Sequence, residues 1–238
     1  MPGRPRARPL PSSQPQNPPG AHFLTDHGLI ARLVKASGVG AGDLVFDLGA
    51  GFGALTAPLA RTGARVVAIE LDPALAGRLR RRFGADPLVG VVEADLRRVP
   101  LPRRPFHVVA SPPFALTTLL CRRLLGDRAV RLAGAELILE WGAAKWLSSR
   151  DPRDREIALW SSRYLIRLVR RVAAASFSPA PRSDAAYVRI RPRLEADRGE
   201  RCAEGALPGG LRPGRTRRWR LQVVQGGQGR PHDVGWSP

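Results

Sequence analysis

The chain has 238 residues, which is enough for one substantial α/β core with appendages. Its formal net charge of +19 favours a polyanionic partner, either a nucleic acid or an acidic membrane surface. Two cysteines and four scattered histidines exclude a disulfide framework and a zinc motif, and no apolar run approaches the ~20 residues that span a bilayer. The basic, proline-rich N-terminus lacks the apolar segment of a signal peptide, so we expect a cytoplasmic, metal-free protein.

Composition divides the chain into three parts. Residues 1–20 are basic and proline-rich with almost nothing to bury, so they predict a disordered arm. Residues 21–193 carry the periodic apolar patterns of a folded domain. Residues 194–238 are rich in Gly, Arg and Pro without a sustained period, which predicts a mostly disordered tail.

The folded domain begins with a helix and continues as alternating strands and helices. Asp26 precedes apolar residues at helical spacing from Leu29 to Val34, which predicts a capped helix. The short apolar runs that predict strands are Leu44–Leu48, Val66–Glu70, Val89–Glu93, Phe106–Ala110 and Glu136–Glu140, then Tyr164–Val169 and Ala186–Ile190 as an antiparallel end. The predicted helices between them are Ala54–Arg61, Pro73–Arg82 and Thr117–Leu125. This pattern indicates an α/β fold, a doubly wound and mostly parallel sheet.

A glycine-rich turn follows the first strand and predicts a nucleotide-like ligand. Gly49 and Gly51 let the backbone approach a ligand beyond the carboxyl end of the strand. Glu70 ends the second strand, where its carboxylate can accept both hydroxyls of a ribose. Asp95 follows the third strand and is placed to accept from an adenine amine.

The same turn also fits a dinucleotide fingerprint. Gly49, Gly51 and Ala54 match G-x-G-x-x-A, with Glu70 roughly twenty residues further on. No second nucleotide-binding half and no hydride-handling residues follow. A different motif follows the fourth strand, and it favours S-adenosyl-L-methionine over a dinucleotide.

That motif is Ser111-Pro112-Pro113-Phe114. The two prolines restrict the backbone, so the carbonyl of Pro112 and the hydroxyl of Ser111 can both accept from an amine. Phe114 offers a flat face on which an extruded base can stack. The combination indicates methyl transfer to the exocyclic amine of a nucleobase.

Together these residues resemble the Erm family of 23S rRNA adenine-N6 methyltransferases, relatives of the small-subunit rRNA dimethyladenosine transferases. Ala21–Leu24 resembles an N-terminal element that closes over the cofactor, and residues 47–56 (DLGAGFGALT) and 69–73 (IELDP) resemble the first two family motifs. Residues 93–95 and 111–114 match the next two, and residues 177–185 resemble the family's Phe-x-Pro-x-Pro segment. The resemblance implies a Rossmann-like methyltransferase fold that binds S-adenosyl-L-methionine and acts as a monomer on 23S rRNA.

Motifs and resemblance together assign the site residues. Those predicted to bind the cofactor are His22, Leu24, Gly49, Gly51, Glu70, Asp95 and Ser111. Those predicted to act on the acceptor are Ser111, Pro112, Phe114 and Phe177, with Phe177 implied to hold the target adenine against Phe114. The implied target lies in the peptidyl-transferase region, where methylation blocks macrolide, lincosamide and streptogramin B antibiotics.

Three departures from the family pattern leave alternatives open. His22 and Ser111 each stand where the family has Asn, and the usual C-terminal helical domain is not recognisable after Arg193. RNA binding then depends on arginines such as those of residues 150–171. The alternatives are an RNA-binding relative with little turnover because of Ser111, and a DNA amino-methyltransferase.

Overall fold

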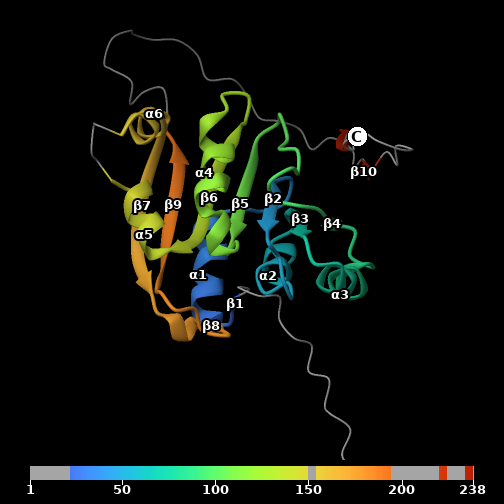
Figure 1. Cartoon of the computed structure of the whole chain (residues 1–238). Helices are drawn as coiled ribbons and strands as arrows, with labels where there is room; N and C mark the ends of the chain where they lie inside the picture. Colours follow the sequence, from blue (N-terminus) through green and yellow to red (C-terminus); the bar gives the residue numbers. More distant parts are fainter. Residues whose placement is uncertain (1–21, 150–153, 194–219, 224–233, 238) are drawn as a thin grey trace, which may run out of the picture.

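The computed structural model describes residues 22–149, 154–193, 220–223 and 234–237. A seven-stranded sheet runs through it in the order β4-β3-β2-β5-β6-β9-β7 (Figure 1). Its strands are β2 (Leu44–Leu48), β3 (Arg65–Glu70), β4 (Val89–Glu93), β5 (Phe106–Ala110), β6 (Leu132–Glu140), β7 (Tyr164–Val172) and β9 (Ala185–Pro192). Strands β2 to β6 are parallel, and β9 is antiparallel to both of its neighbours. The predicted mostly parallel sheet with an antiparallel end is confirmed.

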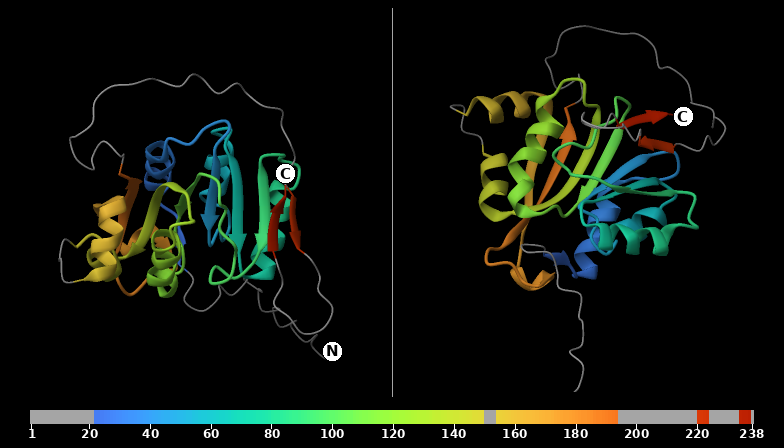
Figure 2. Two further views of the ribbon diagram at one scale, coloured as in Figure 1. Left: turned by 90° about the horizontal axis from the view of Figure 1, so that it is seen from above. Right: turned by 45° about the vertical axis from the view of Figure 1, so that its right-hand side comes forward.

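Helices cover both faces of the sheet. They are α1 (His27–Ser37), α2 (Thr56–Ala60) and α3 (Pro73–Phe83) on one face, and α4 (Thr117–Cys121), α5 (Trp141–Leu147) and α6 (Arg155–Arg163) on the other. Figure 2 shows α1 and the yellow-green helices on opposite sides. Alternation along β3 explains the layering, because Val66 packs with α1 and α2 whereas Val67 packs with α4 to α6.

Local signals account for most helix boundaries. The Asp26 side chain accepts from the Leu29 N–H at 2.9 Å and caps α1, which ends at Gly38 with φ 68°. The helix predicted over Ala54–Arg61 is shorter, since α2 spans only Thr56–Ala60. The helix predicted over Thr117–Leu125 is divided, because α4 passes into a π-helical turn, η2, at Arg122–Gly126.

A second, two-stranded sheet joins the two ends of the folded domain. Strand β1 (Phe23–Leu24) pairs with β8 (Phe177–Ser178) in antiparallel register. The Thr25 N–H donates to the carbonyl of Ser176 at 2.8 Å and extends this contact. The pairing brings the predicted N-terminal element against the Phe177 segment, more than 150 residues away along the chain.

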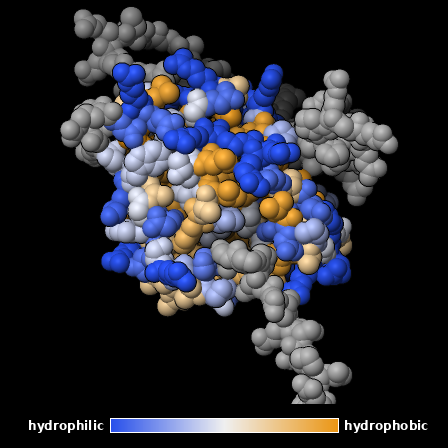
Figure 3. Space-filling view, in the orientation of Figure 1, coloured by the Kyte–Doolittle hydropathy of each residue, from blue (hydrophilic) through white to orange (hydrophobic). Residues whose placement is uncertain are grey.

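The predicted arm and tail lie largely outside the described residues. Within the tail the structure describes only β10 (Arg220–Val223) and β11 (Val234–Ser237), which pair antiparallel. Among the described residues, none of the helices combines the length and apolar character that crossing a membrane requires. Figure 3 shows strongly hydrophilic side chains over much of one face, interrupted near its middle by an apolar strip.

Candidate active site

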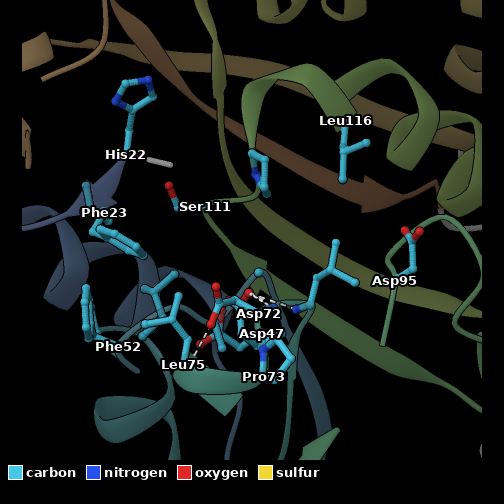
Figure 4. A pocket seen from close by; sticks show the side chains of 18 of the residues that line it. His22, Phe23, Asp47, Phe52, Asp72, Pro73, Leu75, Asp95, Ser111 and Leu116 are labelled. Carbon is cyan, nitrogen blue, oxygen red and sulfur yellow. Dashed lines mark hydrogen bonds between the residues drawn. The ribbon is translucent and has the colours of Figure 1, made fainter. Parts of the chain in front are cut away.

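A pocket of about 660 Å³ opens at the carboxyl ends of the parallel strands. Six of the predicted site residues line it: His22, Leu24, Gly49, Glu70, Asp95 and Ser111. Figure 4 shows His22 and Ser111 at one end and Asp95 at the other. Four predicted residues are not among the lining residues: Gly51, Pro112, Phe114 and Phe177. Parallel strands explain the convergence, because their carboxyl ends meet at one edge of a sheet.

The turn after β2 requires glycines because neighbouring side chains lie too close to leave room for a Cβ. Gly49 has φ 77°, and a Cβ there would lie 3.1 Å from Cδ of Pro113. Gly51 has φ 55°, and a Cβ there would lie 2.7 Å from the ring of Phe23. The turn therefore fits tightly between the Pro112-Pro113 corner and the N-terminal element, because Gly49 and Gly51 carry no side chains.

Glu70 is fixed by backbone donors at the end of β3. Its Oε2 accepts from the Gly51 N–H at 2.8 Å, and its Oε1 accepts from the N–H groups of Leu71 and Asp72 at 2.8 and 3.0 Å. A carboxylate has about four acceptor positions, so capacity remains for a ribose hydroxyl. The same bonds hold the glycine turn against the second strand.

Asp95 is paired in a way that the sequence motifs did not suggest. Arg97 donates to it from Nε at 2.8 Å and from Nη2 at 2.7 Å, and this hydrogen bonding lowers the pKa of the Asp95 carboxyl. The Arg97 side chain is 58% exposed, so its guanidinium can move into solvent. A ligand amine could then bind to the Asp95 carboxylate beside it or in its place.

An arginine on the π-helical turn holds the loop after Asp95. Arg123 donates through Nη1 to the carbonyl of Leu96 and through Nη2 to the carbonyl of Val99. Burial lowers the pKa of Arg123, although the nearby Asp95 raises it. The helix that follows residues 111–114, here called the acceptor corner, is thus tied to the loop that carries Asp95. Sequence reasoning missed Arg123, whose partners are backbone atoms and leave no motif.

Asp47 is a second functional candidate that the motif assignment left out. It lines the pocket beneath the glycine turn, is 1% exposed, and accepts from Oγ1 of Thr56 at 2.6 Å. Burial raises the pKa of Asp47 to about 7, with a further contribution from the charge of Glu70. A charged residue inside an otherwise apolar strand was the available signal.

The acceptor corner leaves one polar atom unsatisfied. Oγ of Ser111 is buried and has no hydrogen-bond partner within the part of the chain that the structure describes. The carbonyl of Pro113 accepts from the Leu116 N–H at 2.9 Å, which closes the turn behind Phe114. A buried hydroxyl without a partner is costly, and its position at the pocket makes it a group prepared for a ligand.

The structure brings three aromatic rings together beside Ser111. The centroids of Phe114 and Phe177 are 5.9 Å apart, but their planes stand at 81°, and Phe177 is only 4% exposed. The His22 ring lies 6.0 Å from Phe114 at an angle of 39°. Phe114 and Phe177 are therefore neighbours, as the resemblance implies, but in edge-to-face contact with no gap for a base between them.

Apolar side chains form pocket walls that sequence reasoning missed. Leu71, directly after Glu70, is 55% exposed, and Phe52, inside the glycine turn, is 37% exposed. The Phe23 ring packs on Phe52 with centroids 4.5 Å apart. Large apolar residues next to a strand-end acid or inside a glycine turn were the available signal.

The pocket fits the predicted cofactor. It combines a carboxylate with a free acceptor position at Glu70, an exposed apolar wall at Leu71, backbone at the glycine turn and an unsatisfied hydroxyl at Ser111. An adenosine with a short, polar amino-acid tail presents the matching groups: hydroxyls, a flat apolar ring and a charged end.

Comparisons with known proteins agree with this geometry. The family model "Ribosomal RNA adenine dimethylase" matches residues 16–200. An rRNA adenine N-6-methyltransferase of Bacillus licheniformis is 30% identical over 80% of this chain and 67% of its own length. The mycinamicin-resistance protein MyrB of Micromonospora griseorubida is 36% identical over 77% of this chain and 58% of its own length.

Solved structures show the same fold. A crystal structure of the 23S rRNA methyltransferase ErmE aligns with a TM-score of 0.65 at 28% identity, over 72% of this chain and 70% of that one. A dimethyladenosine transferase from Plasmodium falciparum aligns with a TM-score of 0.66 at 21% identity, over 75% of this chain and 66% of that one. The chain spans about two thirds of the length of several relatives and less of others. It belongs to the ribosomal RNA adenine dimethylase family of S-adenosyl-L-methionine-dependent methyltransferases.

Proposed function

We propose that this chain transfers a methyl group from S-adenosyl-L-methionine to the exocyclic N6 amine of an adenine in 23S rRNA. Family membership supports the reaction type, and the similarity to ErmE and MyrB supports the large-subunit target. Methylation there protects the ribosome against macrolide, lincosamide and streptogramin B antibiotics. Because the substrate is ribosomal RNA, the protein acts in the cytoplasm, and we propose that it does so as a monomer.

The observation that carries the proposal is the unsatisfied hydroxyl of Ser111. It lies at the pocket end of β5, beside Phe114 and the Pro112-Pro113 corner. An amine that enters here finds an acceptor without another partner among the described residues. Neither a dinucleotide nor a hydroxyl substrate requires two acceptors next to an aromatic face.

The residues act mainly by positioning. The bound cofactor supplies an electrophilic methyl group. Ser111 Oγ and the Pro112 carbonyl accept from the two N–H groups of the amine, which directs its lone pair toward the pocket. Phe114 fixes the plane of the base. Well-oriented reactants recover ~7–11 kcal/mol of a barrier. The transfer leaves S-adenosylhomocysteine and a methylated, positively charged nitrogen, which is acidic enough to lose its proton to water without a dedicated general base.

Exposed arginines on β7 are the proposed RNA-binding surface in the described part of the chain. Strand β7 is the edge of the sheet, and Arg167, Arg170 and Arg171 on it are exposed. Arginine suits phosphate recognition because its planar fork donates two parallel hydrogen bonds. This basic edge is the proposed surface for the phosphate backbone of the RNA.

The test is methylation of protein-free 23S rRNA with labelled cofactor, followed by primer extension to locate the modified adenine. The proposal expects a stop at one adenine in 23S rRNA and none in a matched reaction with duplex DNA. Binding of S-adenosylhomocysteine without label on any adenine of the rRNA contradicts it. Label transferred to DNA instead of rRNA selects a DNA amino-methyltransferase.

Ser111 also favours a second candidate, an RNA-binding relative without turnover. Serine is shorter than the asparagine of the family, so its oxygen reaches less far toward an amine and holds it less firmly. Replacing Ser111 with Asn separates the two. A change from no activity to full activity supports the binding protein, whereas activity already present in the wild type rejects it.

A further inference from the structure

The two outermost strands on one side of the sheet, β9 and β7, are left open on the face where α1 packs, here called the α1 face (Figure 1). Helix α1 contacts β5 and β6, whereas the helices that pack extensively on β9 and β7 are α5 and α6, on the opposite face. Among the described residues, no helix packs extensively on the α1 face of this strand pair. The side chains there are available to a partner.

Strand register places three charged residues in one row across this part of the sheet. Glu136 on β6 is the register partner of Arg189 on β9, and Arg189 is the register partner of Arg167 on β7. Residues directly opposite each other on antiparallel strands point to the same face, with Cβ atoms about 4.5–5.5 Å apart. Tyr187, two residues before Arg189, packs in the core cluster of α1, so the row lies on the α1 face.

The carboxylate in this row is fully engaged by its neighbours. Glu136 is 0% exposed and accepts from the hydroxyl of Tyr187. It also accepts from Nη2 of Arg191 and, at 3.3 Å, from Nε of Arg189. Two guanidinium groups thus share one carboxylate, which leaves one positive charge uncompensated. Arg167 adds another, because it is exposed and makes no hydrogen bond or ion pair with any described residue.

Arg189 is oriented before any ligand arrives. Its Nη2 donates to the hydroxyl of Tyr187 at 2.9 Å, in addition to the bond from Nε to Glu136. The side chain is still 37% exposed, and its Nη1 has no hydrogen-bond partner in the described part of the chain. A guanidinium that is fixed on one side and open on the other can donate two parallel bonds to a phosphate and loses little entropy when it does so.

Two cations directly opposite each other destabilise a sheet unless an anion lies between them. Arg170, the register partner of Tyr187, is exposed on the same face as Arg167 and Arg189, so it adds to the repulsion. The other carboxylate near this face, Asp26, is engaged as the cap of α1. A phosphate between the opposed guanidinium groups turns their repulsion into attraction, and the net charge of +19 favours a polyanion as its source.

The arginine row lies beside the edge of the sheet at which the candidate active site opens. The carboxyl end of β6 pairs with the amino end of β9, Glu140 with Ala185. Arg189 is four residues further along β9, about 13 Å from that edge at ~3.3 Å per residue. A nucleic-acid strand that leaves the pocket toward β7 therefore meets this row with a phosphate beyond the target nucleotide, which favours RNA over a lipid surface.

We propose that Arg167 and Arg189 together bind one backbone phosphate of the RNA, on the α1 face of the β9–β7 pair, at a position that flanks the target nucleotide. Arg171 is not part of this site, because it pairs with Asp184 and stands over the ring of Trp141. The inference rests on the proposed function for RNA as the partner, and it adds the face and the side chains that hold the phosphate.

The experiment measures binding of the full chain to a fluorescently labelled fragment of protein-free 23S rRNA at about 50 to 200 mM salt, without cofactor, so that no methyl transfer occurs. Arg167→Gln removes one charge, and Arg189→Lys keeps a cation beside the buried Glu136 while removing the planar fork. Arg61→Gln is the matched control. Arg61 is exposed at the end of α2, beside β3, and strands β5, β6 and β9 separate β2 from β7.

We expect Arg167→Gln to reduce the slope of log affinity against log salt by about 0.7–0.9, the contribution of one phosphate, and to lower the affinity about fivefold or more at 0.1 M salt. Arg61→Gln leaves the slope unchanged. Arg189→Lys also weakens binding, and its loss is not additive with that of Arg167→Gln because both side chains contact one phosphate. The Tm of Arg167→Gln is not below that of the wild type, since a like-charge pair is removed.

Unchanged slope and affinity in Arg167→Gln overturn the inference. An equal loss in Arg61→Gln also does so, because net charge rather than a site then accounts for binding. Strict additivity of the Arg167 and Arg189 variants rejects a shared phosphate. A Tm lowered by more than about 4 °C in Arg167→Gln assigns that residue a structural role instead. Binding to phosphatidylglycerol vesicles that depends on Arg167, with RNA binding intact, assigns the face to an acidic membrane and likewise overturns the inference.

Methylation assays separate this inference from the proposed function. A chain that binds rRNA through Arg167 and methylates none of it supports the phosphate site and rejects the enzymatic function. Methylation by the wild type, together with an Arg167→Gln variant that matches it in affinity and salt dependence, rejects the phosphate site and leaves the enzymatic function standing.

Discussion

At the scale of single residues, the proposed function makes the hydroxyl of Ser111 the acceptor that aligns the amine. Its Oγ is buried at the pocket without a partner among the described residues. Ser111→Ala is expected to lower kcat for rRNA methylation by roughly 10- to 100-fold, the loss typical of misplacing a reacting group by up to ~1 Å. Single-turnover kinetics measure this effect. Unchanged kcat in the folded variant contradicts the assignment.

Glu70 holds the glycine turn against the end of β3 and is the residue predicted to bind the ribose. Glu70→Gln replaces a carboxylate that accepts three backbone N–H bonds with an amide that has one oxygen. Affinity for S-adenosylhomocysteine is expected to fall about 10- to 100-fold in calorimetry. Glu93→Gln is the control, because Glu93 is the register partner of Glu70 on β4 and pairs with the exposed Arg80 outside the pocket. Equal losses in both variants refute the role of Glu70.

Asp47 makes stability depend on pH in a defined direction. Its pKa in the folded protein is about 7, above the ordinary value of 3.8, so the folded state holds a proton that the unfolded state releases. The stability from this group is full below pH ~4 and is lost as the pH rises to about 7. The Tm of the wild type minus that of Asp47→Asn is expected to decrease over this interval and then level off. A difference that does not vary with pH contradicts the buried, protonated carboxyl.

At the scale of secondary structure, the π-helical turn η2 holds the Asp95 loop through Arg123. Arg123→Met leaves the buried carbonyls of Leu96 and Val99 without their donor, and we expect it to lower the free energy of unfolding by about 1–3 kcal/mol. Arg122→Met is the control, because Arg122 makes an exposed ion pair with Glu156, worth about 0–1 kcal/mol. Urea denaturation measures both variants. Equal losses contradict the anchoring role.

The strand-end residues of the site were predictable from the sequence. Gly49, Glu70, Asp95 and Ser111 each follow or end an apolar run, and parallel strands bring such positions to one edge of the sheet. The short apolar runs along the sequence are enough to predict these strands, because each run is local and does not depend on contacts with distant residues.

Features that depend on distant packing could not be predicted in this way. The β1–β8 pair involves two residues on each side, too few for a periodic signal. The division of the helix after Thr117 depends on where Arg123 finds its backbone partners. The ring angle between Phe114 and Phe177 depends on core packing, so a motif predicts their proximity but not their orientation.

At the scale of the whole molecule, the sheet separates the two tasks of the site. The predicted cofactor residues Gly49, Glu70 and Asp95 lie at the carboxyl ends of β2, β3 and β4, the predicted acceptor corner follows β5, and the exposed arginines lie on β7 at the opposite edge. A net charge of +19 favours a polyanionic partner, and the basic edge strand lies on the acceptor side of the sheet.

The most direct measurement is nucleoside mass spectrometry of 23S rRNA after incubation with the full chain and a cofactor whose methyl group carries deuterium. The account predicts deuterated N6-methyladenine that appears with the wild type and is reduced at least about tenfold by Ser111→Ala. Deuterium found on a base carbon, on a ribose hydroxyl or on no nucleoside, in a protein that binds S-adenosylhomocysteine, contradicts it.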